Sequence, residues 1–151
     1  ISMPSASIKK EISCSKENLI KMVLDIEKYP EFVPWCLKGK IHNRIDKGKI
    51  IEITADLTIG KSFFSETYKS FVIYNKSTSS INVTNIGGPL KHLENNWFFK
   101  EKGNNSEVDF QVDFELKNEI LNMFMIKFFD IGLKKIAVAF EERAKILFKR
   151  I

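Results

Sequence analysis

The chain contains little cysteine and histidine and no long apolar run. Its 151 residues include only two cysteines, Cys14 and Cys36, which are too few for a disulfide framework and typical of a reducing compartment. The two histidines have no metal-binding spacing and no CxxC pair accompanies them, so we expect no zinc site. No apolar stretch reaches the roughly 18 residues of a membrane span, and no signal-like leader opens the chain. These absences predict a cytoplasmic protein.

Arginine is also scarce. The 24 basic and 19 acidic residues give a net charge of +5, yet only three of the basic residues are arginines, at positions 44, 143 and 150. Interfaces that read nucleic-acid sequence favour the planar fork of arginine over lysine. The pI near 9.1 is therefore weak evidence for a nucleic-acid partner. We expect no DNA binding, and only a mild attraction to anionic membranes or RNA.

What the chain does contain is an ordinary globular composition that is rich in phenylalanine. Hydrophobic residues make up 44% and charged residues 28% of the sequence, which suits one domain over residues 1–151. Ile1 and Ser2 precede Met3, which we take as the natural first residue. The 13 phenylalanines predict an interior lined by large, flat, apolar side chains.

The first part of the chain predicts a weak strand, a helix and a rigid loop. Residues 6–13 alternate weakly, and Ser15 is placed to cap a helix whose apolar stripe runs from Leu19 to Ile26. Pro30 is expected to end this helix. Residues 29–36 contain two prolines, so they predict a short helical turn within a rigid loop.

The rest of the chain predicts strands followed by one long helix. Apolar and polar residues alternate clearly at 51–59 and 107–116, and less clearly at 63–74, 80–86 and 92–100, with turns at Gly48 and 103–105. Asn118 caps a helix predicted to run to about Phe148. Its first half, up to Leu133, is apolar almost all round, so we expect it to be buried on more than one side. The predicted fold class is α+β: a curved antiparallel sheet of about six or seven strands wrapped around the long C-terminal helix, with a cavity between.

Four stretches carry a resemblance to a known family. They are Tyr-Pro-Glu-Phe-Val-Pro-Trp-Cys at 29–36, Gly-Pro-Leu-Lys-His-Leu-Glu-Asn at 88–95 followed by Trp97, the strand at 108–115, and Ala-Phe-Glu-Glu-Arg-Ala at 139–144. Here the chain resembles the coenzyme Q-binding START-domain family, a branch of the polyketide cyclase and lipid transport superfamily that includes the bacterial ribosome-association toxins. The resemblance implies a helix-grip fold of the START/Bet v 1-like kind, a bound ubiquinone or other lipid, no covalent cofactor and no catalytic residue.

The expected ligand-binding residues are apolar or aromatic. The loop at 29–36 is placed at the lip of the cavity, where its side chains would contact ligand or, alternatively, plug the core. The other candidates are expected to face inward, where plain core packing is the alternative role. The complete set is Phe32, Val33, Trp35, Leu57, Phe64, Tyr68, Trp97, Phe99, Phe110, Phe114, Phe128 and Phe140.

Polar and sulfur-containing residues are expected to have structural roles. No nucleophile accompanies the polar residues of the 88–95 stretch, and the acidic row at 109–115 alternates with apolar residues as a solvated strand face does. The cysteine beside the lip is expected to be a small buried hydrophobe, and the helix methionines to fill gaps. The residues assigned in this way are His92, Glu94, Asn95, Asp109, Asp113, Glu115, Cys36, Met123 and Met125.

Three functions are weighed, and ligand binding is preferred. The first is the non-catalytic binding or transfer of an isoprenoid quinone in support of respiratory electron transport, with peripheral contact to the inner membrane. The second is a toxin-like protein that binds the large ribosomal subunit and blocks subunit joining. The third is an enzyme of the polyketide cyclase or dehydratase kind, which needs more titratable groups on inward faces than we find. The residues expected to meet an anionic membrane or RNA surface are Lys134, Lys135, Arg143, Lys145, Lys149 and Arg150, with Ile146, Phe148 and Ile151 as apolar membrane contacts.

Overall fold

The structure is a computed structural model that describes residues 5–61, 64–88 and 90–148, apart from the side chains at 61, 64, 121, 124, 125, 127 and 128. The N-terminal elements are β1 (Ser5–Ile12), the helix α1 (Lys16–Leu24) and the 3-10 helix η1 (Ile26–Glu31). Six strands and a helix follow in chain order: β2 (Cys36–Asp46), β3 (Ile50–Lys61), β4 (Phe64–Asn75), β5 (Ser80–Asn85), β6 (Leu90–Lys102), β7 (Asn105–Leu116) and α2 (Glu119–Leu147).

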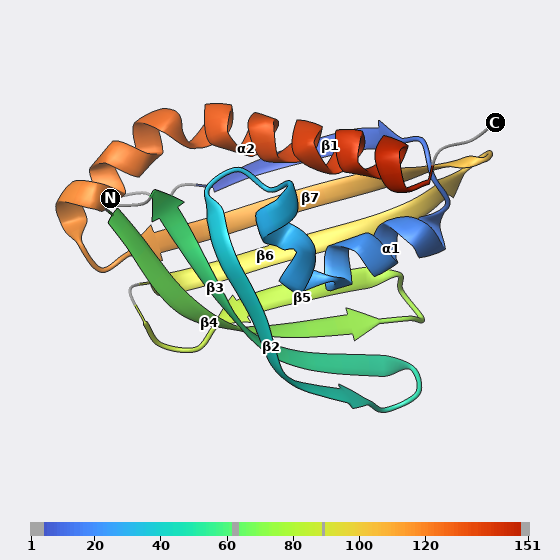
Figure 1. The fold of residues 1–151 in the computed structure, drawn as a ribbon, viewed down its shortest axis with the longest axis horizontal. Helices are drawn as coiled ribbons and strands as arrows, with labels where there is room; N and C mark the ends of the chain where they lie inside the picture. The colour runs from blue at the N-terminus through green and yellow to red at the C-terminus, as the bar shows by residue number, and fades with distance from the viewer. Residues whose placement is uncertain (1–4, 62–63, 89, 149–151) are drawn as a thin grey trace.

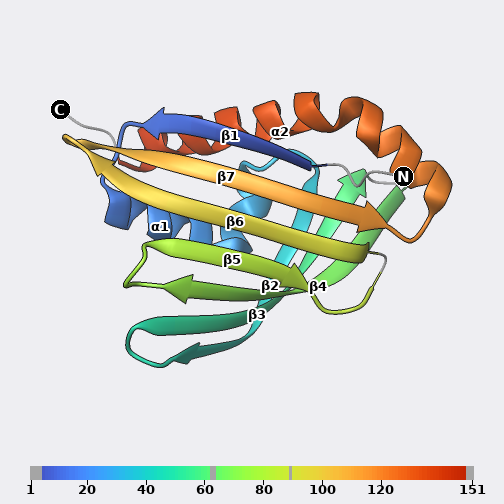
Figure 2. The same cartoon turned by 180° about the vertical axis from the view of Figure 1, so that it is seen from behind.

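All seven strands form one antiparallel sheet in the order β1-β7-β6-β5-β4-β3-β2. Figure 1 shows α2 running along the β1 and β7 side of the curved sheet, with α1 and η1 on the same concave face. Figure 2 shows the opposite face, where the strands lie in front of the helices. The predicted α+β fold, a curved sheet around a long C-terminal helix, is thereby confirmed.

Local capping explains where both helices begin. The hydroxyl of Ser15 accepts a hydrogen bond from the amide of Asn18 at 3.2 Å, and the side-chain oxygen of Asn118 accepts one from the amide of Ile120 at 3.1 Å. Each bond satisfies an amide that has no partner within its own helix. Both predicted N-caps are therefore confirmed.

The predicted end of the first helix is wrong by more than one turn. The helix α1 ends at Leu24, because Asp25 leaves the helical region (φ −84°, ψ 64°) and its amide bonds to Met22 across only three residues. The segment that follows is the 3-10 helix η1, which contains Pro30. Proline has no amide hydrogen to donate, so Pro30 prevents a continuous α-helix through this segment, although α1 has already ended before it.

The strand β2 has no clear sequence pattern. It lies at an edge of the sheet, most of its residues are exposed, and two irregularities shift its register against β3, between Cys36 and Lys38 and between Ile41 and Asn43. Each bulge reverses the inside-outside alternation that predicts a strand. This is why only its hairpin turn at Gly48 was predicted.

The described side chains of α2 are buried on one side of the helix and exposed on the other, which differs from the expectation for its first half. Leu133, Phe140 and Ala144 are buried against the sheet, whereas Ile120 is 81% exposed and Met123 is 69% exposed. The reason is that the described residues place no further layer outside α2. Met123 is therefore not a gap filler, and the side chain of Met125 lies outside the described residues. Within the part of the chain that is described, no helix has both the length and the hydropathy to span a bilayer.

Candidate functional site

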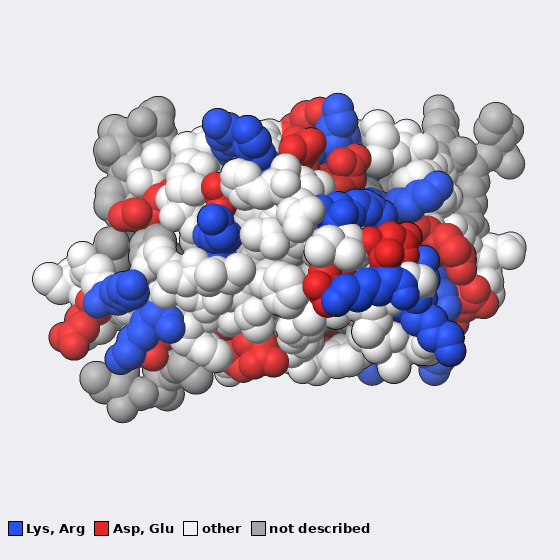
Figure 3. Space-filling model, turned by 90° about the horizontal axis from the view of Figure 1, so that it is seen from below, with Lys and Arg blue, Asp and Glu red and all other residues white. Residues whose placement is uncertain are grey.

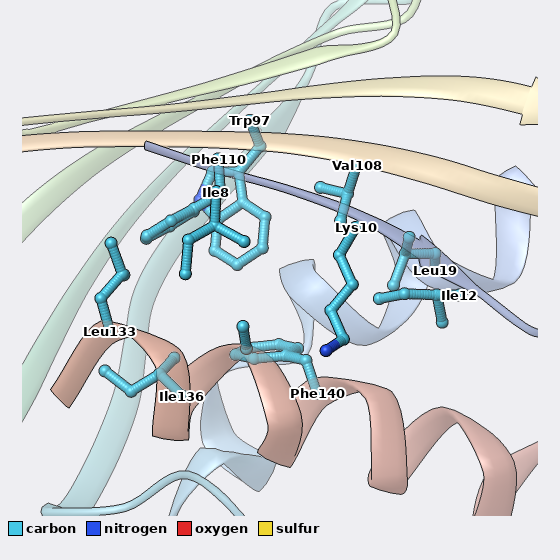
Figure 4. A pocket seen from close by; sticks show the side chains of 11 residues that line it. Ile8, Lys10, Ile12, Leu19, Trp97, Val108, Phe110, Leu133, Ile136 and Phe140 are labelled. Atoms are coloured by element: carbon cyan, nitrogen blue, oxygen red, sulfur yellow. The ribbon is translucent and has the colours of Figure 1, made fainter. Parts of the chain in front are cut away.

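The inner side of α2 and the concave face of the sheet enclose a small apolar cavity. Its volume is about 20 Å³, enough for about one water molecule and far below the roughly 300 Å³ of a small ligand pocket. Figure 4 shows its walls, with side chains of β1, β6 and β7 pointing toward those of α2. The lining residues are Ile8, Lys10, Ile12, Leu19, Trp97, Val108, Phe110, Leu133, Ile136, Ala137 and Phe140.

Three of the lining side chains are aromatic, and they belong to a larger cluster of aromatic rings. The ring of Phe140 on α2 lies 5.4 Å from Trp97 on β6, 5.1 Å from Phe32 and 5.6 Å from Tyr29, all centroid distances with the rings steeply inclined to one another. Trp97 also lies 4.4 Å from Phe110 on β7. Edge-to-face contacts of this kind add to the stability gained from burial. Phe140 is the centre of this aromatic cluster.

The one polar atom of Trp97 is satisfied within the sheet. Its indole Nε1 donates to Oδ1 of Asn95 at 2.8 Å, and Nδ2 of Asn95 donates to the carbonyl of Gln111 at 3.0 Å. The strand register places Asn95 on the same face as Trp97, while His92 and Glu94 lie on the other, as predicted. The indole ring is thus free to present only apolar surface to the cavity.

Two ion pairs connect α2 to the rest of the molecule at the edges of the cavity. Nζ of Lys10 on β1 lies 3.5 Å from a carboxylate oxygen of Glu141, and Arg143 donates to Oε1 of Glu31 on η1 at 2.8 Å. The Arg143 guanidinium also lies 5.1 Å from the ring centre of Phe32. Its hydrogen bond lowers the pKa of the Glu31 carboxyl. The side chain of Arg143 is only 17% exposed, so its expected place among the residues that meet a polyanion is wrong.

The loop at 29–36, which was predicted to form the lip, contributes none of the residues that line the cavity, and its Trp35 has an uncommon backbone conformation. Its φ of 63° lies in the left-handed region, which is rare for a bulky residue. The amide of Gly60 donates to the Trp35 carbonyl at 2.9 Å, and this bond helps to hold the conformation. The indole is 39% exposed and packs on Gly132 of α2, with Nζ of Lys135 located 6.0 Å from the ring centre. Trp35 therefore joins this loop to the helix.

The predicted ligand residues fall into separate groups in the structure. Four of them meet in the aromatic cluster: Phe32, Trp97, Phe110 and Phe140. Phe99 stacks on Trp97 at 6.2 Å, and Phe114 packs on Phe129 at 4.8 Å instead. Leu57 and Tyr68 pair across β3 and β4, and Val33 packs on the core. The side chains of Phe64 and Phe128 lie outside the described residues.

Several residues that line the cavity were not predicted. Ile8, Lys10 and Ile12 face it from β1, and Leu133, Ile136 and Ala137 face it from α2. Residues 8, 10 and 12 point to the same side of the strand, which could have predicted that they line the cavity, but the lysine at position 10 obscured the apolar pattern.

The predicted apolar membrane contacts at the C-terminal end differ from one another. Ile146 is exposed and Phe148 packs against the core, whereas residues 149–151 lie outside the described range.

Burial affects the pKa of two tyrosines and one cysteine, none of which is among the residues that line the cavity. Burial raises the pKa of Tyr29, whose hydroxyl donates to the carbonyl of Val23, and it also raises the pKa of Tyr68. Burial raises the pKa of the Cys36 thiol as well, so this residue is the small buried hydrophobe that was expected. Among the described residues, no group of three or more His, Cys, Asp or Glu side chains is placed to hold a metal ion.

Comparison with known proteins gives consistent matches. The family model described as "Polyketide cyclase / dehydrase and lipid transport" matches residues 14–141. A Rickettsia prowazekii (strain Madrid E) protein named "Ribosome association toxin RatA" is 31% identical over 136 residues, covering 88% of this chain and 90% of that protein. A Dictyostelium discoideum protein named "Coenzyme Q-binding protein COQ10, mitochondrial" is 29% identical, covering 92% and 68%. A START superfamily structure from Mycobacterium smegmatis superposes with a TM-score of 0.81 at 21% identity, covering 97% and 99%.

Proposed function

The chain belongs to the polyketide cyclase / dehydrase and lipid transport family, and on that premise we propose that it binds a hydrophobic ligand, an isoprenoid quinone, between α2 and the sheet. The observation that carries the proposal is the apolar and aromatic lining of the cavity. Its single charged residue, Lys10, directs its Nζ to Glu141 at the edge. Such a lining suits a flat ring and a hydrocarbon tail, because each buried CH₂ of the tail contributes about 0.8 kcal/mol.

A ligand of that size requires α2 to move away from the sheet. The cavity of about 20 Å³ holds neither a ring nor a tail while the aromatic cluster is closed. Three described polar contacts oppose the movement. The side chains of the Lys10–Glu141 pair are 28% and 25% exposed, and Glu31 in the Arg143–Glu31 pair is 49% exposed. The third contact is the hydrogen bond from the amide of Leu116 to Oδ1 of the buried Asn122. Ion pairs that remain in contact with water contribute little stability, so a large part of the cost of opening lies in parting apolar surfaces that the ligand would cover again.

We propose binding and transfer rather than catalysis. General acid-base chemistry needs two positioned titratable groups in a cleft. The lining of the cavity is apolar apart from Lys10. The acidic residues of β7 alternate along the strand with its apolar residues, so they point to the opposite face of the sheet. The names of coenzyme Q-binding relatives support the same choice. A peripheral contact with the membrane from which a quinone would be drawn is part of the proposal.

A second candidate function is association with the large ribosomal subunit. The 31% identity to a protein named as a ribosome association toxin favours it. The charge distribution favours it less: on the face in Figure 3, basic side chains alternate with acidic ones and leave uncharged surface between them. Polyanion binding depends on many uncompensated cations and falls steeply with salt. We expect the protein not to sediment with large subunits at physiological salt.

The experiment that tests ligand binding is native mass spectrometry of the full chain purified from a quinone-containing host, followed by organic extraction. We expect a lipid or quinone in up to equimolar amount. Ala137→Phe fills the cavity wall and should lower the occupancy, whereas Val138→Phe, on the outer side of α2, should leave it unchanged. Absence of any extractable lipid, or equal occupancy in both variants, would overturn the proposal. Cosedimentation with large subunits would favour the second candidate instead.

A further inference from the structure

The side of α2 that faces away from the sheet carries a stripe of exposed apolar residues. Ile120, Ile131 and Val138 are 81%, 57% and 46% exposed. They are spaced by 11 and 7 residues, which is close to whole numbers of helical turns, so they share one side of the helix. Met123 is exposed one turn beyond Ile120. Apolar residues at such spacing normally mark a face that packs against something.

Lysines lie within this stripe. Lys134 and Lys135 are exposed, and among the described residues neither forms an ion pair with an acidic side chain. Nearby acidic side chains are Asp130, which is also exposed, and Glu142, which lies 3.4 Å from Nζ of Lys145. We call the set Ile120, Met123, Ile131, Lys134, Lys135 and Val138 the outer face of α2.

The outer face continues onto the loop at 29–36. The half-exposed indole of Trp35 packs on Gly132, and Lys135 lies over its ring. Tryptophan is favoured where an apolar surface meets water, as at the headgroup level of a bilayer. A helix face that mixes isoleucine, methionine and lysine, with a tryptophan at its edge, has the composition of a helix that lies in a membrane interface.

We propose that the outer face of α2, together with Trp35, docks on the surface of an anionic lipid bilayer. The apolar side chains would enter the boundary between headgroups and acyl chains, and Lys134 and Lys135 would contact lipid phosphates. The inference rests on the proposed function. The opposite side of the same helix lines the cavity through Leu133 and Phe140. Docking would therefore place α2, the element that has to move for a ligand to enter, directly against the bilayer that supplies the ligand.

Two other occupants fit the outer face less well. A second copy of the chain would bury Lys134 and Lys135 in the interface together with the isoleucines, and burying charged side chains costs free energy unless each of them is paired. A nucleic acid would leave the isoleucines against a phosphate backbone that offers them no apolar contact, and the one described arginine of α2 is directed inward to Glu31. A bilayer satisfies the apolar and the basic residues at once.

The test is cosedimentation of the full chain with ligand-free vesicles of phosphatidylcholine, with or without phosphatidylglycerol. We expect binding that requires phosphatidylglycerol and weakens with salt. Replacing Lys134 and Lys135 by Gln should weaken partitioning about fivefold for each lysine. Met123→Ser with Ile131→Ser should weaken it by about tenfold or more. The matched control replaces Lys49 and Lys76 by Gln, two exposed lysines in neighbouring turns far along the sheet, and should bind as the original chain does.

The outcomes separate this proposal from ligand binding itself. All altered residues are exposed, so the variants should keep the circular dichroism and melting temperature of the original chain. Lack of binding to phosphatidylglycerol vesicles, or equal binding by control and outer-face variants, would overturn docking while leaving the lipid content measured by extraction unaffected. A dimer in analytical ultracentrifugation that Ile131→Ser dissociates would assign the face to a second copy. RNA displacing the vesicles would assign it to a nucleic acid.

Discussion

The indole ring of Trp35 lies over Gly132 of α2, at a separation that leaves room for one methyl group. A Cβ added at Gly132 would lie 3.5 Å from Cζ3 and 3.7 Å from Cη2 of the indole, which is ordinary van der Waals contact. The loop and the helix therefore meet without a clash and with little space between them. The contact joins the 29–36 loop to α2, so the movement of α2 that ligand binding would require has to part it.

Gly132→Ala is expected to stabilise the protein. Alanine fits under the indole, and glycine within a helix costs about 0.5–1 kcal/mol relative to alanine. We expect the free energy of unfolding, measured in urea, to rise by up to about 1 kcal/mol. A larger residue, as in Gly132→Leu, should instead displace the Trp35 ring and increase the accessibility of its indole to aqueous quenchers. Loss of stability in the alanine variant would show that the contact is tighter than the structure describes.

Trp35→Ala should weaken lipid retention more than it weakens folding. The side chain is 39% exposed and the residue has a positive φ, so its removal forfeits few core contacts. We expect a loss of less than about 1.5 kcal/mol, against about 3–5 kcal/mol for a buried aromatic residue. Trp97→Ala serves as the buried comparison. If the Trp35 variant loses as much stability as the Trp97 variant, Trp35 is a core residue and not a lip residue.

Phe140→Ala should be among the most destabilising substitutions in the chain. Phe140 is buried and contacts three other rings, so its truncation removes those contacts and enlarges the cavity. The expected cost is about 3–5 kcal/mol in urea unfolding. Phe98 is exposed on the outer side of β6, and Phe98→Ala is expected to change stability by less than about 0.5 kcal/mol. Similar losses in both variants would contradict the central place of Phe140.

The Glu31–Arg143 pair should stabilise the fold in a pH-dependent way. The hydrogen bond from Arg143 lowers the pKa of Glu31 below the ordinary value of 4.5. A carboxyl whose pKa is lowered by folding adds stability above that ordinary value and loses it as the pH falls through the folded value. The difference in unfolding free energy between the original chain and Glu31→Gln should therefore be present at neutral pH and vanish in acid.

The control for this pH dependence is Glu101→Gln. Glu101 is exposed at the end of β6, and none of the described ion pairs includes it. Its replacement should leave the pH profile of unfolding unchanged. If the free energy of unfolding of Glu31→Gln ran parallel to that of the original chain down to acid pH, the ion pair would contribute no pH-dependent stability to the fold.

Contacts between near neighbours in the chain are enough to specify several elements of the fold. The alternation from Val108 to Leu116 is enough to specify a strand with one apolar face, because successive side chains of a strand point to opposite sides. Ser15 and Asn118 cap the helices that follow them, because each bond spans only two or three residues. The four stretches of family resemblance specified how these elements are ordered in space.

Which surfaces those elements cover depends on contacts between segments that are far apart in the chain. The apolar first half of α2 predicted burial on more than one side, but Ile120 and Ile131 are exposed because the described residues place no second layer outside the helix. Arg143 pairs with Glu31, which is 112 residues away in sequence, so its local pattern could not reveal its partner. The size of the cavity likewise depends on how closely Phe140, Trp97 and Phe110 approach. The burial of a side chain, its ion-pair partner and the volume of a cavity all depend on how closely segments distant in the chain approach one another. Local periodicity carries no information about how closely they approach.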